Sequence, residues 1–193
     1  MVKLPEVKGV RGIPLEEAIE KRRSRRRYKG GSLSLEELSR LLFYSYGITG
    51  ERGFRASPSA GALYAIDVYV AVNNVDGLKE GIYLYMPEEH SLDVRREGRF
   101  GIEMTESALG QRMLRDAQVV IALVAVPERM EWRYGERTTR YITLEAGHIA
   151  QNIYLEATSL GLGACAIGAF DDESMSRIFE GRPVIYLVTV GKV

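Results

Sequence analysis

Residues 139–160, TRYITLEAGHIAQNIYLEATSL, contain no proline and lead into GLGACAIGAF at 161–170. Their length and apolar period predict a long helix, and the glycine-rich turn with the apolar residues after it predicts a strand. One helix face mixes polar and apolar residues at spacings of three and four: Leu144, Gly147, His148, Gln151, Tyr154, Leu155 and Thr158. A glycine inside a helix costs about 1 kcal/mol relative to alanine. Gly147 therefore indicates close approach by another helix or by a flat ligand.

Four further helices are predicted around this segment. Pro14 precedes LEEAIEKRR, whose acidic start and basic end complement the helix dipole. Ser34 and Glu37 have the spacing of a capping box and open a helix that Gly47 ends. Another helix is predicted over residues 107–117, and a short one follows that Asp171 or Asp172 caps.

β-Branched and aromatic residues predict strands between the helices. Residues 65–73 (AIDVYVAVN) are one candidate, and GIYLYMPEEHSLDVR at 81–95 predicts a hairpin that turns near residues 88–90. Residues 119–126 (VVIALVAV) are all apolar, as in a strand buried on both faces. Two more strands are predicted near 164–169 and 184–190.

The composition favours one globular domain over residues 1–193. A chain of 193 residues with 46% hydrophobic content is long enough for one well-packed domain and short for two. Its 26 basic and 26 acidic residues cancel, which argues against a dedicated nucleic-acid binder.

Cysteine use and hydropathy indicate the compartment. Cys165 is the only cysteine, so no intramolecular disulfide can form, as is typical of a reducing compartment. The N-terminal residues lack the apolar region of a signal peptide, and residues 119–126 are too few to span a bilayer. We therefore expect a cytoplasmic protein that has no membrane partner.

Positive charge is concentrated in residues 21–29, KRRSRRRYK, where seven Lys and Arg residues surround Ser24. Arginine binds phosphate by bidentate charge-assisted hydrogen bonds, and a serine hydroxyl adds a neutral donor. A solvated helix end or a patch for nucleic acid would produce the same letters. We interpret the segment as a clamp for a cofactor phosphate.

Three other patterns are not interpreted as sites. GLGACA at 161–166 fits G-x-G-x-x-A, but here the helix precedes the strand, the reverse of a dinucleotide-binding turn. Glu145 and His148 have a metal-ligand spacing, yet the other histidine, His90, lies in a predicted turn, so no metal site is expected. Cys165 among small apolar residues predicts a buried structural thiol rather than a nucleophile.

Three motifs in one order resemble the FMN-dependent nitroreductase family. They are R-R-S-x-R at 22–26, S-P-S-A-G-A-L-Y at 57–64, and G-H-I-A-Q-N with G-L-G-x-x-x-I-G-A-F across 147–170. Residues 134–157 are most similar to the SagB-type dehydrogenase branch, whose members oxidise azolines in modified peptides. The resemblance implies an α+β, nitroreductase-like fold, in which a central mixed, mainly antiparallel sheet is flanked by helices in three α/β/α layers.

The resemblance also implies a flavin site and its residues. The resemblance implies that the FMN phosphate and ribityl chain are bound by Arg22, Arg23, Ser24 and Arg26, and that Lys192 also contacts them. A loop that crosses a homodimer interface to the partner's flavin corresponds to Pro58, Ser59, Ala60, Gly61 and Leu63. The isoalloxazine ring would lie along Ile167, Gly168 and Ala169, with a backbone N–H near flavin N5. Gln151 of the long helix completes the set.

The implied activity is ping-pong hydride transfer. NAD(P)H or another reductant reduces FMN and leaves, and an acceptor then occupies the same face. The acceptor is a small molecule or a modified peptide, with azoline dehydrogenation as the analogy from the branch. The cofactor carries this chemistry, so no residue is assigned as catalytic, although Arg26 near N1 and O2 would stabilise reduced flavin. The alternatives are a flavin-binding or flavin-consuming protein without NAD(P)H turnover, and a nucleic-acid-associated domain.

Two segments depart from the family pattern or lie outside it. Many relatives carry an Asn and a Pro-Trp pair where this chain has Ala62, Leu63, Tyr64 and Ala65, so one polar flavin contact is expected to be missing. ERMEWRYGERTTR at 128–140 is a candidate lid with Trp132, Tyr134 and Arg137, or else a solvated helix cap.

Overall fold

The computed structural model describes residues 1–7, 9 and 12–193. The strands of this part of the chain form one seven-stranded sheet in the order β1-β4-β3-β2-β5-β7-β6. Neighbouring strands are antiparallel at each pairing. The strands are β1 (Val2–Lys3), β2 (Ile66–Val72), β3 (Gly81–Met86), β4 (Ser91–Glu97), β5 (Val119–Ala125), β6 (Leu162–Ile167) and β7 (Val184–Lys192).

The central strand β5 explains why the sheet is covered on both faces. Its seven residues, VVIALVA, are all buried. Val119, Ile121 and Leu123 point into one apolar core, whereas Val120, Ala122 and Val124 point into the other. Because strand side chains alternate between faces, an uninterrupted apolar strand requires a helical layer on each side.

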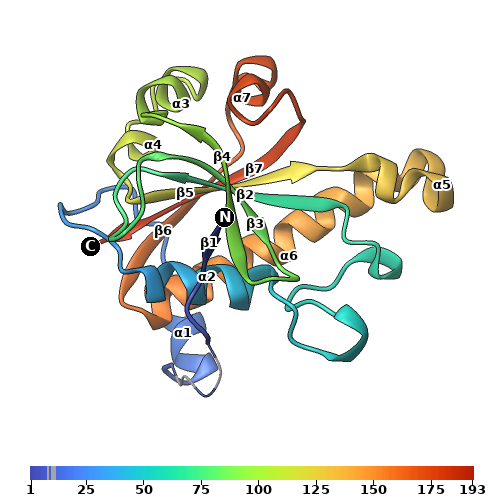
Figure 1. The fold of residues 1–193 in the computed structure, drawn as a ribbon, viewed down its shortest axis with the longest axis horizontal. Coiled ribbons are helices and arrows are strands. Elements are labelled where there is room, and N and C mark those ends of the chain that lie inside the picture. The colour runs from blue at the N-terminus through green and yellow to red at the C-terminus, as the bar shows by residue number, and fades with distance from the viewer. Residues whose placement is uncertain (8, 10–11) are drawn as a thin grey trace.

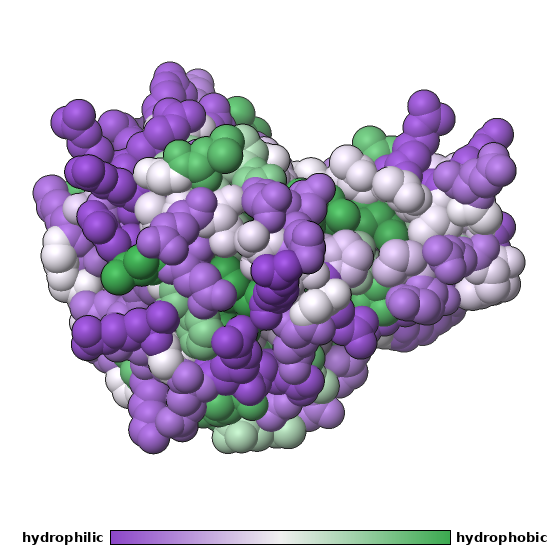
Figure 2. Space-filling model, turned by 90° about the horizontal axis from the view of Figure 1, so that it is seen from above, coloured by the Kyte–Doolittle hydropathy of each residue, from purple (hydrophilic) through white to green (hydrophobic). Residues whose placement is uncertain are grey.

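Helices supply those two layers, so the fold is α+β with three layers, as predicted (Figure 1). One face carries α1 (Leu15–Lys21), α2 (Leu35–Tyr46) and α6 (Thr138–Ser159). The opposite face carries α3 (Gly101–Ser107), α4 (Met113–Asp116) and α7 (Asp172–Ile178). The short helix α5 (Glu131–Tyr134) projects beside the end of α6, and Figure 2 shows this projection as a lobe separated from the body by a hollow.

Several local predictions are confirmed. The Ser34 hydroxyl accepts from the Glu37 N–H and the Glu37 carboxylate accepts from the Ser34 N–H, which is a complete capping box. Gly47 ends α2, β3 and β4 form the hairpin with its turn at residues 87–90, and Asp171 caps α7. Cys165 is buried in β6.

One local prediction is wrong, and another finds no partner among the described residues. The helix predicted over 107–117 is not continuous: α3 ends at Ser107 and α4 spans only Met113–Asp116, because Leu109 and Gly110 adopt left-handed φ values of 56° and 77°. The predicted helix contact at Gly147 does not form within the described chain, since a Cβ at that position would have no heavy atom within 4 Å. The strand β1 had no sequence signal, because two residues are too few to show a period.

Within the residues that the structure describes, no helix is long and apolar enough to cross a membrane.

The capping box provides a test of the fold. Ser34→Ala leaves an N–H of the first turn of α2 without its acceptor, so we expect the free energy of unfolding to fall by about 1 kcal/mol, measured by urea denaturation. Ser32→Ala, two residues earlier and outside the box, is the matched control and should change stability by less than half as much. Equal losses for the two variants would contradict this assignment.

Candidate functional site

The basic segment leaves α1 and attaches to the outer edge of the sheet. Ser24 forms a parallel bridge with Ala164, and the Arg25 N–H donates to the Ala164 carbonyl at 2.8 Å. Farther along, the Lys29 N–H donates to the Lys192 carbonyl at 2.8 Å. The backbone of the segment is therefore fixed along β6 and β7, so its arginines extend from a rigid base.

Tyr28 and Gln118 strengthen this attachment. The Tyr28 hydroxyl lies 2.7 Å from Thr189 Oγ1, and burial raises the pKa of Tyr28. Gln118 Nε2 donates to the Lys29 carbonyl at 2.9 Å, and its Oε1 accepts from the Lys192 N–H at 3.0 Å. Gly191 permits this packing, because a Cβ there would lie 2.2 Å from the Gln118 oxygen.

Most positive charges of this segment have no carboxylate partner among the described residues. Lys21 pairs with Glu17, but in the part of the chain described here no ion pair involves the five arginines or Lys29. Residues 24–29, together with Val193, line a hollow of about 410 Å³. Such a density of exposed, unpaired cations on a fixed backbone favours binding of a compact anion.

One phenol joins this segment to the long helix and to β6. Tyr154 Oη lies 3.0 Å from Ser24 Oγ and accepts from the Ala166 N–H at 2.7 Å. The Arg22 guanidinium lies over the same ring, 5.2 Å from its centroid. Gln151 is exposed one turn earlier on α6. The structure therefore brings Arg22, Ser24 and the end of β6 together.

The predicted ring-binding stretch follows directly. Ile167 is buried and pairs with Leu187, whereas Gly168 and Ala169 are exposed just beyond the strand. Gln111 Nε2 donates to the Ala169 carbonyl at 2.9 Å and so fixes the stretch from the opposite layer. Lys192 pairs with Leu162 at the other end of β6. A flat ligand can approach this backbone because Gly168 and Ala169 present almost no side chain.

The predicted loop is held in place by a buried carboxylate. Glu145 on α6 is 1% exposed, and it accepts from the Tyr46 hydroxyl and the Ser59 hydroxyl, each at 2.6 Å. Burial raises the pKa of Glu145, and these hydrogen bonds oppose that shift. Ser59 Oγ also accepts from the Tyr64 N–H at 2.9 Å. The Ser59 hydroxyl thus faces the protein interior, and the loop presents its backbone outward.

The same loop is conformationally strained. Gly61, Ala62 and Tyr64 have φ values of 62°, 55° and 50°, in the left-handed region that residues with a Cβ disfavour. A Cβ at Gly61 would lie 2.8 Å from the Tyr134 hydroxyl and 2.9 Å from an Arg133 nitrogen, so the loop touches the candidate lid. Leu63 packs against the core instead. This geometry needs strong anchors, and Glu145 is one of them.

The loop and the basic segment lie apart within one chain. Ser59 is attached at Glu145 and Ser24 at Tyr154, nine residues farther along α6. At 1.5 Å per residue, this separation is about 14 Å along the helix axis. The two predicted parts of the site are therefore anchored more than two turns apart on α6.

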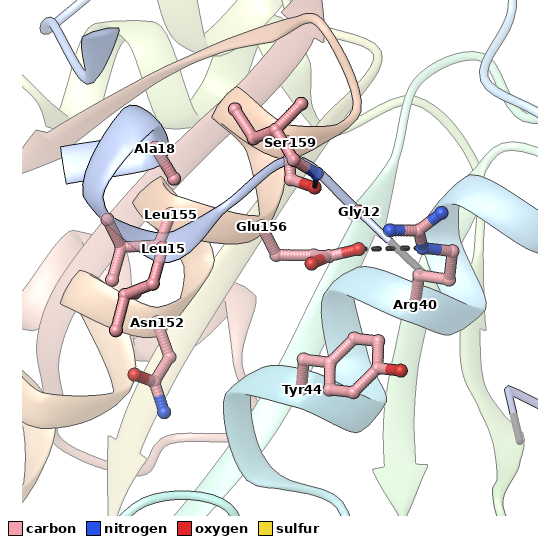
Figure 3. Close-up of a pocket in the computed structure, with 10 residues that line it drawn as sticks. Gly12, Leu15, Ala18, Arg40, Tyr44, Asn152, Leu155, Glu156 and Ser159 are labelled. Atoms are coloured by element: carbon pink, nitrogen blue, oxygen red, sulfur yellow. Dashed lines mark hydrogen bonds and ion pairs between the residues drawn. The ribbon is translucent and has the colours of Figure 1, made fainter. Parts of the chain in front are cut away.

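A second hollow, of about 300 Å³, lies between α1, α2 and α6 (Figure 3). Its apolar wall contains Leu15, Ala18 and Leu155. On its polar wall Arg40 and Glu156 form a 2.7 Å ion pair, so the charges there are already satisfied. The hollow has no excess charge with which to attract an anion.

The Glu145–His148 pair does not form a metal site. Glu145 is buried toward Tyr46, whereas His148 is exposed on another side of α6. Among the described residues, no group of three or more His, Cys, Asp or Glu side chains could hold a metal ion. Glu145 and Tyr154 are the residues that the sequence alone did not identify as site residues, because their partners lie far away in sequence.

An antiparallel sheet between helical layers, with a cationic segment beside the exposed Gly168-Ala169 end of β6, is consistent with a flavin-dependent oxidoreductase. The chain belongs to the nitroreductase family, whose family model matches residues 19–192.

Individual relatives agree with this assignment. The chain is 42% identical over 192 residues to a candidate nitroreductase of Methanocaldococcus jannaschii, covering 99% of this chain and 96% of the relative. It is 30% identical over 143 residues to the trifolitoxin-processing protein TfxB of Rhizobium leguminosarum, covering 67% of this chain but only 38% of that protein.

Solved structures agree as well. A candidate nitroreductase of Ralstonia eutropha superposes with a TM-score of 0.87 at 29% identity, covering 100% of this chain and 89% of the other. An FMN complex from Desulfovibrio desulfuricans (TM-score 0.64, 20% identity, 92% and 85% covered) shares the fold. So does a chain of the Escherichia coli microcin synthetase McbBCD complex with truncated pro-MccB17 (TM-score 0.73, 21% identity, 100% and 77% covered).

The raised pKa of Glu145 gives a test of the loop anchor. The folded protein holds this proton more tightly than the unfolded chain does, so the contribution to stability is present in acid and is lost as pH rises from 4.5 through the folded pKa. We expect the unfolding free energy of Glu145→Gln to fall less steeply with pH above 4.5 than that of the wild type, measured by urea denaturation at each pH. The exposed Glu106→Gln should keep the wild-type slope. A wild-type slope in Glu145→Gln would contradict the assignment.

Proposed function

We propose that this chain is an FMN-dependent oxidoreductase whose basic segment clamps the cofactor phosphate. The observation that carries the proposal is the set of unpaired cations fixed against the end of β6. Arg22, Arg23, Ser24, Arg26 and Lys192 would hold the phosphate and ribityl chain. The exposed backbone of Gly168 and Ala169 would lie along the ring. An FMN-bound protein of this fold supports the choice of cofactor.

The residues fit this cofactor chemically. A phosphate dianion can accept two parallel hydrogen bonds from each arginine guanidinium group. A flat ring needs a backbone surface without large side chains, which residues 168–169 provide. When bound, FMN supplies a ring that accepts and returns a hydride. The protein contributes orientation, exclusion of water and positive charge, and Arg26 is the candidate to stabilise the reduced, anionic ring.

NAD(P)H is the reductant that we propose, with ping-pong turnover to a second substrate. The acceptor would be a small molecule or a modified peptide, and azoline dehydrogenation is the specific candidate. Two similar proteins support a peptide as the acceptor. TfxB is named as a trifolitoxin-processing protein, and the microcin synthetase McbBCD complex has truncated pro-MccB17 bound. The Trp132 side chain belongs to the candidate lid and is 73% exposed, so it is available to contact such a substrate.

A homodimer with shared flavin sites would complete the geometry. The loop and the clamp lie at different points of α6, so residues 58–61 would reach the flavin of the partner subunit. Leu15, Ile19 and Leu144 on α1 and α6 are 59%, 53% and 55% exposed, which gives these helices an apolar surface. Gly147, on the same helix as Leu144, has open space above it that a partner could fill.

The clamp is tested by charge removal. Arg22→Ala with Arg26→Ala should weaken FMN binding by at least about 100-fold, because each charge-assisted bond contributes about 1.5–3 kcal/mol, and flavin titration of the apoprotein measures this loss. Arg112→Ala with Arg182→Ala removes the same charge from exposed positions outside the clamp and should bind FMN as the wild type does. Unchanged affinity in the clamp variant would refute the assignment.

The shared site is tested by mixing inactive variants. Pro58→Trp would block the loop side of the site, while the doubly substituted clamp variant lacks the phosphate side. Each alone should turn over NAD(P)H poorly, whereas dimers that are refolded together should regain one working site in each mixed dimer. Absence of any recovery, in mixtures shown by mass spectrometry to contain mixed dimers, would indicate that each site lies within one chain.

A further inference from the structure

Tyr154 lies where the clamp, the long helix and β6 meet. Its hydroxyl contacts Ser24 Oγ at 3.0 Å and the Ala166 N–H at 2.7 Å, and its ring supports the Arg22 guanidinium. Ser24 and Tyr154 are 130 residues apart in sequence. Three of the contacts that define this end of the site therefore depend on one side chain.

The chemistry of the partners sets the direction of one of these two hydrogen bonds. The Ala166 N–H can only donate, so the Tyr154 oxygen is the acceptor in that bond. The distance between the two hydroxyls permits either direction for the second bond. When Tyr154 donates its own hydrogen, Ser24 Oγ accepts and keeps its hydroxyl hydrogen to donate elsewhere. Bonds aligned in this way polarise and strengthen one another.

We infer that Tyr154 is a positioning residue that makes the Ser24 hydroxyl a donor toward a bound phosphate and connects the clamp to the strand end beside residues 167–169. The inference rests on the proposed function, since it assumes that the clamp holds a phosphate. It predicts a chain of donors from Ala166 N–H through Tyr154 and Ser24 to the phosphate oxygen. The Arg22 guanidinium, packed on the same ring, approaches that anion with fewer accessible orientations.

Riboflavin separates this role from simple packing, because it has the ring and the ribityl chain but no phosphate. Tyr154→Phe keeps the ring in place and removes only the hydroxyl. If the hydroxyl acts on the phosphate through Ser24, its loss weakens FMN binding and leaves riboflavin binding nearly unchanged. If Tyr154 only packs, Tyr154→Phe binds both ligands as the wild type does.

The experiment measures the affinities of FMN and riboflavin for the full-length apoprotein and its variants by fluorescence titration. We expect Tyr154→Phe and Ser24→Ala each to weaken FMN binding about tenfold, to change riboflavin binding less than twofold, and to be no worse when combined. Tyr83→Phe is the matched control, since Tyr83 lies on β3, four strands from β6, and its hydroxyl donates to the Lys79 carbonyl. This variant should bind both ligands as the wild type does.

Each other outcome decides against the inference. Unchanged FMN binding by Tyr154→Phe, additive losses in the double variant, or equal losses of FMN and riboflavin would overturn the role of Tyr154 and leave the clamp intact. Should Tyr154→Phe unfold, Ser24→Ala still decides, because an unchanged ratio of FMN to riboflavin affinity would remove the donor on which the inference depends. A wild-type protein that binds riboflavin and FMN equally would overturn both this inference and the phosphate clamp.

Discussion

A polar group inside a protein must find a hydrogen-bond partner, and on α6 this requirement positions the whole site. Glu145 and Asn152 reach out of the helix to one loop, at Ser59 and, at 3.0 Å, at Ser57. Tyr154 reaches the basic segment at Ser24 and β6 at Ala166. An unsatisfied buried polar group costs about 1–3 kcal/mol. These segments therefore cannot move away from α6 without losing that free energy, and the helix itself is held by the sheet.

This arrangement has a consequence for a shared flavin site. Under the proposed dimer, the Tyr154 end of α6 would support a chain's own clamp, while the Glu145 end would support the loop in the partner's site. One rigid helix of 22 residues would then belong to both sites. The strain in residues 61–64 fits this picture, because a loop that projects toward another subunit needs anchoring from behind, as the buried Glu145 carboxylate provides. The exposed side of the helix, with Leu144 and Gly147, would face the partner.

Local signals in the sequence predicted the local structure well. The capping box of α2, the hairpin turn near His90, the fully buried β5 and the long α6 each follow from residues within one turn or one strand. The order of three motifs indicated the family and hence the three-layer architecture. The break at Leu109 was missed because only Gly110 marked it, and a single glycine does not distinguish a kink from an end.

The supporting contacts of the site could not be predicted in the same way. Glu145 shows a metal-like spacing to His148 in the sequence, and its true partners, Tyr46 and Ser59, are 99 and 86 residues away. In the sequence, Tyr154 is only one residue of a helix face that mixes polar and apolar side chains. Its contact with Ser24 becomes visible only in the folded structure. Such contacts depend on which segments the sheet order places together, and local periodicity carries no information about that order.

The most direct test of the central claim is the stoichiometry of flavin binding to the wild-type protein. The visible spectrum of the purified protein would be recorded, and the chromophore that it releases would be identified by chromatography. The protein would then be stripped of ligand and titrated with FMN. A clamp built from unpaired arginines beside an exposed strand end predicts one FMN per chain, with affinity well above that for riboflavin. A protein that binds no FMN, or that binds it no better than riboflavin, would contradict the account and leave the cationic segment without its anion.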